Sequence, residues 1–324
     1  MRGTDYVVKR VLFAIGTVFV AITLNFVLFR AVSGDAVSAL RCRQCTQQFK
    51  EYQRRELGLD KSKWEQYKIY LVDLAHGNLG RSLRTEEPVT SVLVEPIKNT
   101  VPMIALGTLF SIVFGIATGV VAAWRRGTAA DKGALWGGLG FYSMPPQWLG
   151  LVIVLFIADR IWLPTSGVQS PTLGILSNPS TIEVVADRLE HMILPALTLG
   201  LVIFGEYTLI VRSAMLETLG EDYVLTSRAK GLSNWATVWK HGFRNAMLPV
   251  ITLVALSLGF IIGGAITVEY VFSYPGIGLL IVEAIDQRDY PVLQAAFLIL
   301  TLSVIFFNLI ADLLYFRLDP RVTE

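Results

Sequence analysis

Long apolar runs dominate the chain, and charged residues separate them. Five runs without a charged side chain cover residues 11–29, 101–124, 133–158, 245–268 and 291–311. Each holds roughly 19 to 26 residues, the length that a helix needs to cross a hydrocarbon core of about 30 Å. A sixth run at residues 192–211 contains Glu206, but its apolar flanks favour the same interpretation. The pattern therefore predicts an all-α membrane protein with six transmembrane helices.

The composition agrees with this prediction and removes other classes. The 324 residues are 53% hydrophobic and 17% charged, with a mean hydropathy of +0.54, which is more apolar than one soluble domain would bury. A net charge of +2 gives no reason to expect nucleic acid as a partner. The chain lacks the G-x-x-x-x-G-K-[ST] phosphate loop of an ATPase, so a partner must hydrolyse any ATP used.

Basic residues in the short connections predict the orientation. Arg125, Arg126 and Lys132 follow the second run, and five more cations lie between residues 212 and 244. These connections should face the cytoplasm, which places both termini there as well. The first run is too long for a signal peptide and is interpreted as a retained anchor. We expect an anchor helix at residues 1–30, a large extracytoplasmic insertion at 31–98 and a five-helix core at 99–324.

Small residues recur every four positions on the second run, at Gly107, Ser111, Gly115 and Gly119. They predict a helix face that another backbone can approach closely. Gly133 with Gly137, and Gly259 with Gly263, repeat the spacing on the third and fifth runs. Glu206 has two interpretations, a structural side chain that reaches the cytoplasmic end or a residue that lines a pathway.

Two cysteines form a C-x-x-C pair in the insertion. Cys42 and Cys45 lie on the side that we expect to be oxidising, where a disulfide, a contact with a partner protein and two free thiols all remain open. A structural zinc site needs about four ligands. Outside the membrane only His76 is available, apart from His191 at a span end, so we predict no metal site.

The connection at residues 222–249 has its own pattern. Gly231 interrupts a helical run, Ser233 or Asn234 can cap a second short helix, and Pro249 lies near the start of the fifth run. These residues predict a helix-turn-helix knob on the cytoplasmic face. From its charge alone, the knob would be an ordinary positive anchor.

The order of residue types in this connection resembles the inner-membrane permease subunits of ABC importers of the oligopeptide and dipeptide type. The resemblance rests on R-A-K-G-L at 228–232 followed by His241, Arg244, Asn245, Leu248 and Pro249. Further landmarks are L-G-L-D at 57–60, G-N-L-G at 77–80, L-P-T-S-G at 163–167, F-S-Y-P-G-I-G at 272–278, R-D-Y-P at 288–291 and L-D-P-R at 318–321. Two features depart from the family. Leu225 stands where the wider family often has Glu, and residues 39–50 match no landmark.

The resemblance implies two functional segments and no catalytic residue. The ATPase-docking loop, at about residues 213–245, would include Asp222, Tyr223, Arg228, Ala229, Lys230, Gly231, Leu232, His241, Arg244 and Asn245. The outer gate would include Tyr274, Pro275, Gly276, Gly278, Arg288 and Asp289. We expect Gly276 and Gly278 to let the chain turn after Pro275.

The resemblance also implies the partners and the location. This multi-pass chain of the bacterial inner membrane would pair with a second homologous permease and with two subunits that bind ATP and Mg, without a cofactor of its own. An extracytoplasmic binding protein would deliver peptides, although nickel complexes or other small solutes remain alternatives. A proton-driven carrier that uses Glu206 is disfavoured because only one acid lies within a span. An intramembrane hydrolase is disfavoured because the spans hold no Ser, His and Asp set.

Overall fold

The computed structural model describes residues 3–32, 48, 51, 54–55, 58, 60–173 and 179–318. Cys42 and Cys45 lie outside these residues, so their state stays a prediction. The main helices are α1 (Gly3–Val32), α3 (Lys63–Ala75), α4 (Val89–Trp124), α5 (Ala129–Ser143), α6 (Pro146–Ile153), α8 (Thr181–Leu219), α11 (Arg244–Val271), α12 (Ile277–Gln287) and α13 (Tyr290–Leu318). The shorter ones are α7 (Asp159–Ile161), α9 (Asp222–Ala229) and α10 (Asn234–Thr237), with π-helical turns η1 (Val154–Ala158) and η2 (Val238–Phe243).

Five of the six predicted apolar runs each lie within one helix, and the run at 133–158 is divided between two. Among the described residues, α1, α4, α8 and α13 are long and apolar enough to cross a membrane. The bent pair of α5 and the helix at Pro146–Ala158 makes a fifth crossing if the two parts are one span. The run at 245–268 lies within the 28 residues of α11. An all-α membrane protein is thus confirmed, while the number six, the domain boundaries and the side of the termini stay predictions.

The run at 133–158, predicted as one helix, is broken. α5 ends at Ser143, Met144 is extended with ψ 129°, and α6 begins at Pro146. The chain bends by 106° between the two parts. Proline lacks an amide hydrogen and disfavours the helical conformation in the residue before it, so the pair Pro145 and Pro146 stops the helix here.

The small-residue face of α4 packs directly against α8, as predicted. A Cβ added to Gly115 would lie 2.5 Å from the Cβ of Tyr207, and one added to Gly119 would lie 2.7 Å from that of Val211. Ser111 donates a 2.9 Å hydrogen bond to the Gly200 carbonyl on α8. The two backbones therefore approach so closely that these glycines have no room for a side chain.

The corresponding prediction for the third run is wrong. A Cβ added to Gly133 or Gly137 would meet nothing within 4 Å. The close contact of α5 with α8 is instead made one residue later, where the Gly138 carbonyl would lie 2.2 Å from a Cβ on Gly205. The side chains of residues 259 and 263 lie outside the described set, so their pairing stays a prediction.

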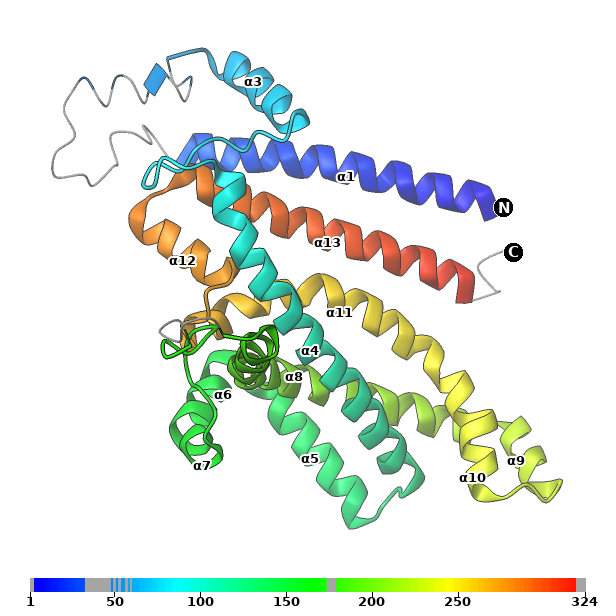
Figure 1. Ribbon diagram of the computed structural model, residues 1–324. Coiled ribbons are helices and arrows are strands. Elements are labelled where there is room, and N and C mark those ends of the chain that lie inside the picture. The colour runs from blue at the N-terminus through cyan, green and yellow to red at the C-terminus, as the bar shows by residue number, and fades with distance from the viewer. Residues whose placement is uncertain are drawn as a thin grey trace.

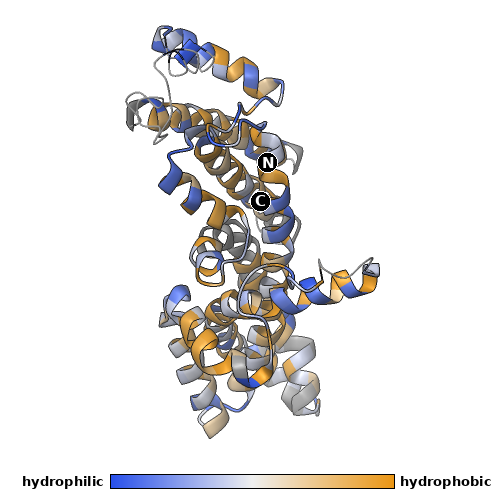
Figure 2. Cartoon of the chain, turned by 60° about the vertical axis from the view of Figure 1, so that its left-hand side comes forward, coloured by the Kyte–Doolittle hydropathy of each residue, from blue (hydrophilic) through white to orange (hydrophobic). Residues whose placement is uncertain are grey.

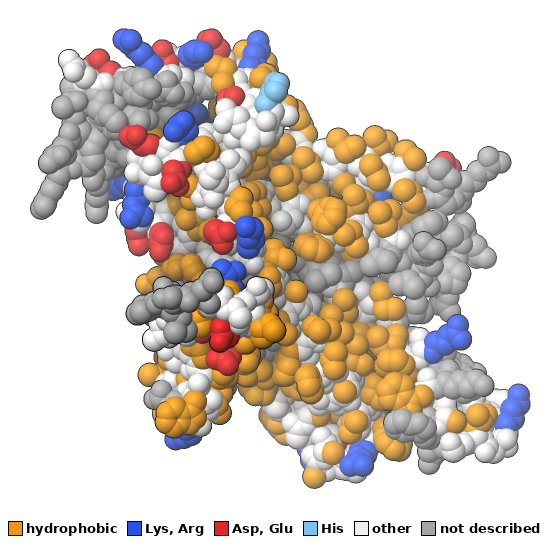
Figure 3. All heavy atoms as spheres, in the orientation of Figure 1, with side chains coloured by type: hydrophobic (Ala, Val, Ile, Leu, Met, Phe, Trp, Pro, Cys, Tyr) orange, Lys and Arg blue, Asp and Glu red, His pale blue; other side chains and the backbone are white. Residues whose placement is uncertain are grey.

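The helices form an elongated bundle with two distinct ends. The start of α1 and the end of α13 lie at the same end as α9 and α10, whereas α3 and α12 lie at the other (Figure 1). Arg10 and Asp312 join α1 to α13 through a 3.2 Å ion pair. Hydrophobic residues line the long helices (Figure 2), and most charged side chains gather at the two ends (Figure 3). This distribution suits a protein surrounded by lipid along its middle.

Candidate functional site

The knob predicted at residues 222–249 is a helix-turn-helix in the structure. α9 ends at Ala229, and Gly231 then adopts the left-handed conformation with φ +81°. The Ser233 hydroxyl accepts a 3.2 Å hydrogen bond from the Ala236 amide, so Ser233 is the cap of α10. The expected interruption and the expected cap are both confirmed.

The knob exposes its turn and buries its base. Val224 and Ser227 on α9 are buried, whereas the predicted docking residues with described side chains lie at the surface: Asp222, Ala229, Lys230, Gly231 and Arg244 are exposed, and Leu232 is half-buried. The side chains of Tyr223, Arg228, His241 and Asn245 are outside the described set. The turn at residues 229–231 is therefore accessible to another protein.

The knob is rooted in a packed cluster at the ends of α8 and α11. Val238 on η2 and Ala246 on α11 are buried with Val211 and Met215 of α8. A Cβ on Gly242 would lie 3.0 Å from Leu219 Cδ2, so the π-helical turn also lies close to α8. A displacement of the knob would therefore displace α8 and the start of α11.

An ion pair that the sequence did not predict stabilises the same end of the bundle. Arg212 on α8 donates hydrogen bonds of 2.6 and 3.0 Å to the two oxygens of Asp131, ahead of the apolar run that begins at 133. The Gly127 amide donates a further 2.8 Å bond. Arg212 and Gly127 together lower the pKa of Asp131 to about 2. Arg212, predicted only as a marker of the cytoplasmic side, thus fixes α5 against α8.

The predicted outer gate surrounds a buried carboxylate. Glu269, near the end of α11, is 0% exposed and accepts a 2.6 Å hydrogen bond from the Thr100 hydroxyl on α4. Its other oxygen accepts from the backbone amides of Gly278 at 2.6 Å and Leu279 at 3.1 Å. These amides belong to the first turn of α12, where a carboxylate satisfies free donors and favours the helix dipole.

Glycine is required at positions 276 and 278 by the closeness of this carboxylate and of α11. This corrects the prediction that the two glycines let the chain turn after Pro275. Neither has a positive φ, so the turn itself does not require glycine. A Cβ on Gly276 would lie 2.3 Å from Glu269 Oε1, and one on Gly278 would lie 2.4 Å from the Cα of Ile266. The two glycines therefore allow α12 to approach α11 closely.

The rest of the outer gate is held by α4 and by the loop before it. The Asn99 side chain donates to the Pro275 carbonyl at 2.9 Å, and the buried Tyr274 hydroxyl donates to the Asn99 carbonyl at 3.4 Å. Asp289 lies at the far end of α12 and accepts from the Ser82 hydroxyl at 2.5 Å. Arg288 beside it has φ +58° and ends α12. The gate residues thus form two groups, one at each end of α12.

Sequence reasoning missed Glu269, Thr100 and Asn99 as members of this site. None of the sequence patterns or family landmarks assigned a role to Glu269. A signal was present, because an acid ends a long apolar run and two glycines follow seven and nine residues later. Its partner Thr100 lies 169 residues away, and no local pattern could have paired them.

Two sets of polar side chains are relevant to the alternative functions of a proton-driven carrier and a hydrolase. Glu206 on α8 is half-buried, and no hydrogen bond or ion pair joins it to the described residues. Ser170, Asp187 and His191 come together, but the Ser170 hydroxyl donates to Asp187 at 2.5 Å rather than to the histidine. The His191 Nδ1 faces the Asp187 carbonyl at 2.8 Å. A serine nucleophile needs a base as its partner, so this arrangement is not that of a hydrolase.

Comparison with known proteins extends the picture to the whole chain. Residues 115–324 match the binding-protein-dependent transport system inner membrane component, and residues 4–104 match its N-terminal counterpart. The chain is 37% identical to the di/tripeptide transport system permease protein DppB of Pseudomonas aeruginosa, over 98% of both chains. It is 34% identical to the glutathione transport system permease protein GsiC of Escherichia coli K12, again over 98% of both. The chain therefore belongs to the inner-membrane permeases of binding-protein-dependent ABC importers, of the dipeptide and oligopeptide type.

Proposed function

We propose that this inner-membrane permease forms half of the path by which an ATP-driven importer takes up short peptides. The full-length similarity to permeases named for di/tripeptides and for glutathione, itself a peptide, carries the proposal. A second homologous permease forms the other half. An extracytoplasmic binding protein delivers the peptide, and two ATP-binding subunits supply the energy.

The coupling to ATP runs through the exposed turn of the knob. Ala229, Lys230 and Gly231 project from a base that is packed against α8 and α11. A groove on the ATP-binding subunit that receives this turn would move the two helices whenever the ATP-binding subunits close. The buried base supports this role, because a loosely attached loop would absorb the displacement.

The outer hairpin, residues 272–289, is the proposed gate on the opposite side. Glu269, Thr100 and Asn99 hold its first part against α4, so a shift between α4 and α11 changes the position of the hairpin. The binding protein releases its peptide next to this hairpin. The peptide identity is set largely by that protein, and nickel complexes are the alternative cargo to be tested.

The first experiment is gentle purification of the chain from its own membrane, followed by mass spectrometry of its companions. We expect a second permease and one or two ATP-binding subunits. Uptake of a labelled dipeptide by the reconstituted complex should require ATP and should survive collapse of the proton gradient. Uptake that needs the proton gradient and not ATP would show that the protein is a proton-driven carrier. Competition by nickel complexes for dipeptide uptake would indicate that nickel, rather than peptide, is the transported solute.

The knob is tested by Ala229→Glu, which adds a charge and bulk to the exposed turn. We expect the ATP-binding subunits to be lost from the purified complex, or their hydrolysis to continue without uptake. Ala130→Glu is the matched control, because Ala130 is also exposed at this end and lies in the first turn of α5, where an acid is tolerated. Equal uptake by both variants would contradict the role of the knob.

A further inference from the structure

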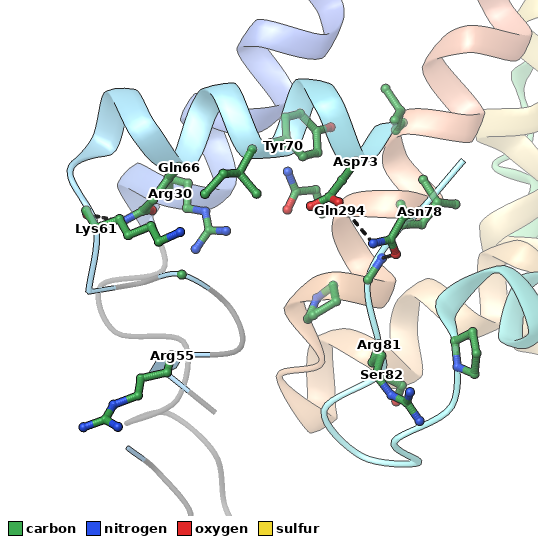
Figure 4. A pocket seen from close by; sticks show the side chains of 18 of the residues that line it. Arg30, Arg55, Lys61, Gln66, Tyr70, Asp73, Asn78, Arg81, Ser82 and Gln294 are labelled. Carbon is green, nitrogen blue, oxygen red and sulfur yellow. Dashed lines mark hydrogen bonds between the residues drawn. The ribbon is translucent and has the colours of Figure 1, made fainter. Parts of the chain in front are cut away.

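A hollow of about 900 Å³ lies at the end of the molecule opposite the knob. Its walls are the end of α1, helix α3, the loop at residues 78–88 and the start of α13 (Figure 4). The volume falls within the range of small-molecule sites in proteins. None of the residues assigned above to the knob or to the outer gate lines it.

Cations outnumber anions around this hollow. Arg30, Arg55, Lys61 and Arg81 line it together with Asp73 and Glu86, which leaves an excess of two positive charges, four minus two. The carboxylate of Asp73 already accepts a 3.2 Å hydrogen bond from Asn78. Lys61 has only a long, exposed contact of 3.9 Å with Glu65. The field in the hollow therefore favours an anion.

Arg30 is the strongest indication of a ligand. This half-buried guanidinium lies over the Phe26 ring at 5.8 Å, and no carboxylate pairs with it among the described residues. Removing a cation from water without an anionic partner is unfavourable. An arginine fork also matches the geometry of phosphate and carboxylate oxygens.

Gln294 presents a second donor on the opposite wall. Its side-chain amide nitrogen is buried beside the Tyr70 hydroxyl, which is a weak partner, and it makes no hydrogen bond of normal geometry with the described residues. Figure 4 places Gln294 between Arg30 on one side and Asn78 on the other. A buried donor without an acceptor is rare in native proteins. Both walls therefore offer hydrogens to an acceptor that the described part of the chain does not supply with good geometry.

The surroundings place the hollow at the level of lipid headgroups. Leu24, Val27 and Leu28 are more than half exposed on the last turns of α1, directly before Arg30. Trp64 on α3 is 65% exposed with the Lys68 ammonium over its ring, the pairing of aromatic and cation that is typical of a membrane interface. Apolar chains and an anionic group are thus accommodated side by side.

We propose that this hollow binds the phosphate of an anionic phospholipid. The Arg30 guanidinium and the Gln294 amide donate to the phosphate oxygens, Lys61 contributes charge, and the acyl chains lie along the exposed face of α1. The lipid holds α3 and the loop at 78–88 in place, and that loop is bonded to Asp289 at the end of α12. The proposal does not depend on the transported solute.

The test compares lipid retention in the full-length chain and its Arg30→Gln and Lys61→Gln variants, purified with any companion subunits. Each is returned to bilayers of phosphatidylcholine with or without phosphatidylglycerol, and bound lipid is counted by native mass spectrometry. We expect selective retention of phosphatidylglycerol by the unchanged chain, reduced at least about tenfold by Arg30→Gln. Arg30→Lys keeps the charge but not the fork, so it should retain less lipid than the unchanged chain and more than Arg30→Gln, which also controls for misfolding.

Lys98→Gln is the matched control for Lys61→Gln. Lys98 has a similar exposed contact on its own helix, with Glu95 at 3.1 Å, but it does not line the hollow. Equal retention of the two lipids, or equal retention by Arg30→Gln and the unchanged chain, would overturn the proposal. So would displacement of the lipid by inorganic phosphate alone, or loss of a bound protein rather than lipid from the Arg30 and Lys61 variants.

Discussion

The hydroxyl of Thr100 and the carboxylate of Glu269 lie 2.6 Å apart and join two helices across 169 residues of sequence. The same Thr100 oxygen accepts a 2.9 Å hydrogen bond from the Ile277 amide. One threonine and one glutamate thus hold α4, α11 and the first turn of α12 together. The outer hairpin is fixed by polar contacts that water does not reach.

Removal of this carboxylate should loosen the hairpin. Glu269→Ala leaves the buried Gly278 amide and the partly buried Leu279 amide without their acceptor, at a cost of about 1 to 3 kcal/mol for the buried one. We expect a clearly lower unfolding temperature and faster thiol labelling of a reporter cysteine at Ala284, a buried position of α12. Glu283→Ala, which alters an exposed acid on α12, should change neither measurement. Unchanged labelling of Glu269→Ala would mean that Glu269 does not hold the hairpin.

The contact between α4 and α8 predicts a sharp difference between two glycines. Gly115→Ala places a methyl group 2.5 Å from the Cβ of Tyr207, so the helices must separate. Overpacking of this kind costs about 1 to 3 kcal/mol. Gly133→Ala meets nothing within 4 Å and should leave stability unchanged or raise it. Thermal unfolding of both proteins in the same detergent measures the difference, and equal temperatures would refute close packing at Gly115.

Gly231 should be sensitive to backbone conformation alone. Its φ of +81° strains any residue with a Cβ, although the space around it is open. Gly231→Ala should cost about 1 kcal/mol locally and weaken coupling between ATP hydrolysis and uptake. Gly231→Asn should retain more coupling, because asparagine tolerates the left-handed region better. If alanine and asparagine behave alike, the conformation of the turn does not matter for coupling.

The Arg212 and Asp131 pair predicts a specific pH dependence. The pKa of Asp131 is lowered from 3.8 to about 2, so the stabilisation is complete above the ordinary pKa and is lost as pH falls toward 2. The unfolding temperature difference between the unchanged chain and Asp131→Asn should therefore be constant from about pH 5 to 8. Asp286→Asn, at an exposed position, is the control. A difference that shrinks within this range would indicate another titrating group.

Most of the helices could be predicted from the sequence, because they depend on local patterns. Apolar length marked the helices, and glycine with serine marked the turn of the knob. The Gly107 to Gly119 spacing predicted a close contact but did not name α8 as the partner. The break at Met144 was missed, although Pro145 and Pro146 are a local signal for it. The 26 residues of the run at 133–158 are long enough for one span, but the proline pair divides it.

The site was less predictable because its chemistry depends on pairs that are distant in sequence. Glu269 with Thr100, Arg212 with Asp131 and Asp289 with Ser82 become neighbours only after the helices pack. The family resemblance indicated the hairpin as a segment but not the carboxylate of Glu269 on α11 that holds it. The local rule that associates glycine with turns gave the wrong reason for Gly276 and Gly278, which are required by close approach instead.

The length of α4 links the outer hairpin to the opposite end of the bundle, where the knob lies. Its 36 residues extend about 54 Å, so one helix reaches the outer hairpin through Thr100 and also lies along α8, in which the knob is rooted. If α4 and α8 translate together, the two faces of the membrane cannot change independently. In the proposed importer, closure at one face would then accompany opening at the other, and a continuous path for ions would not form during uptake.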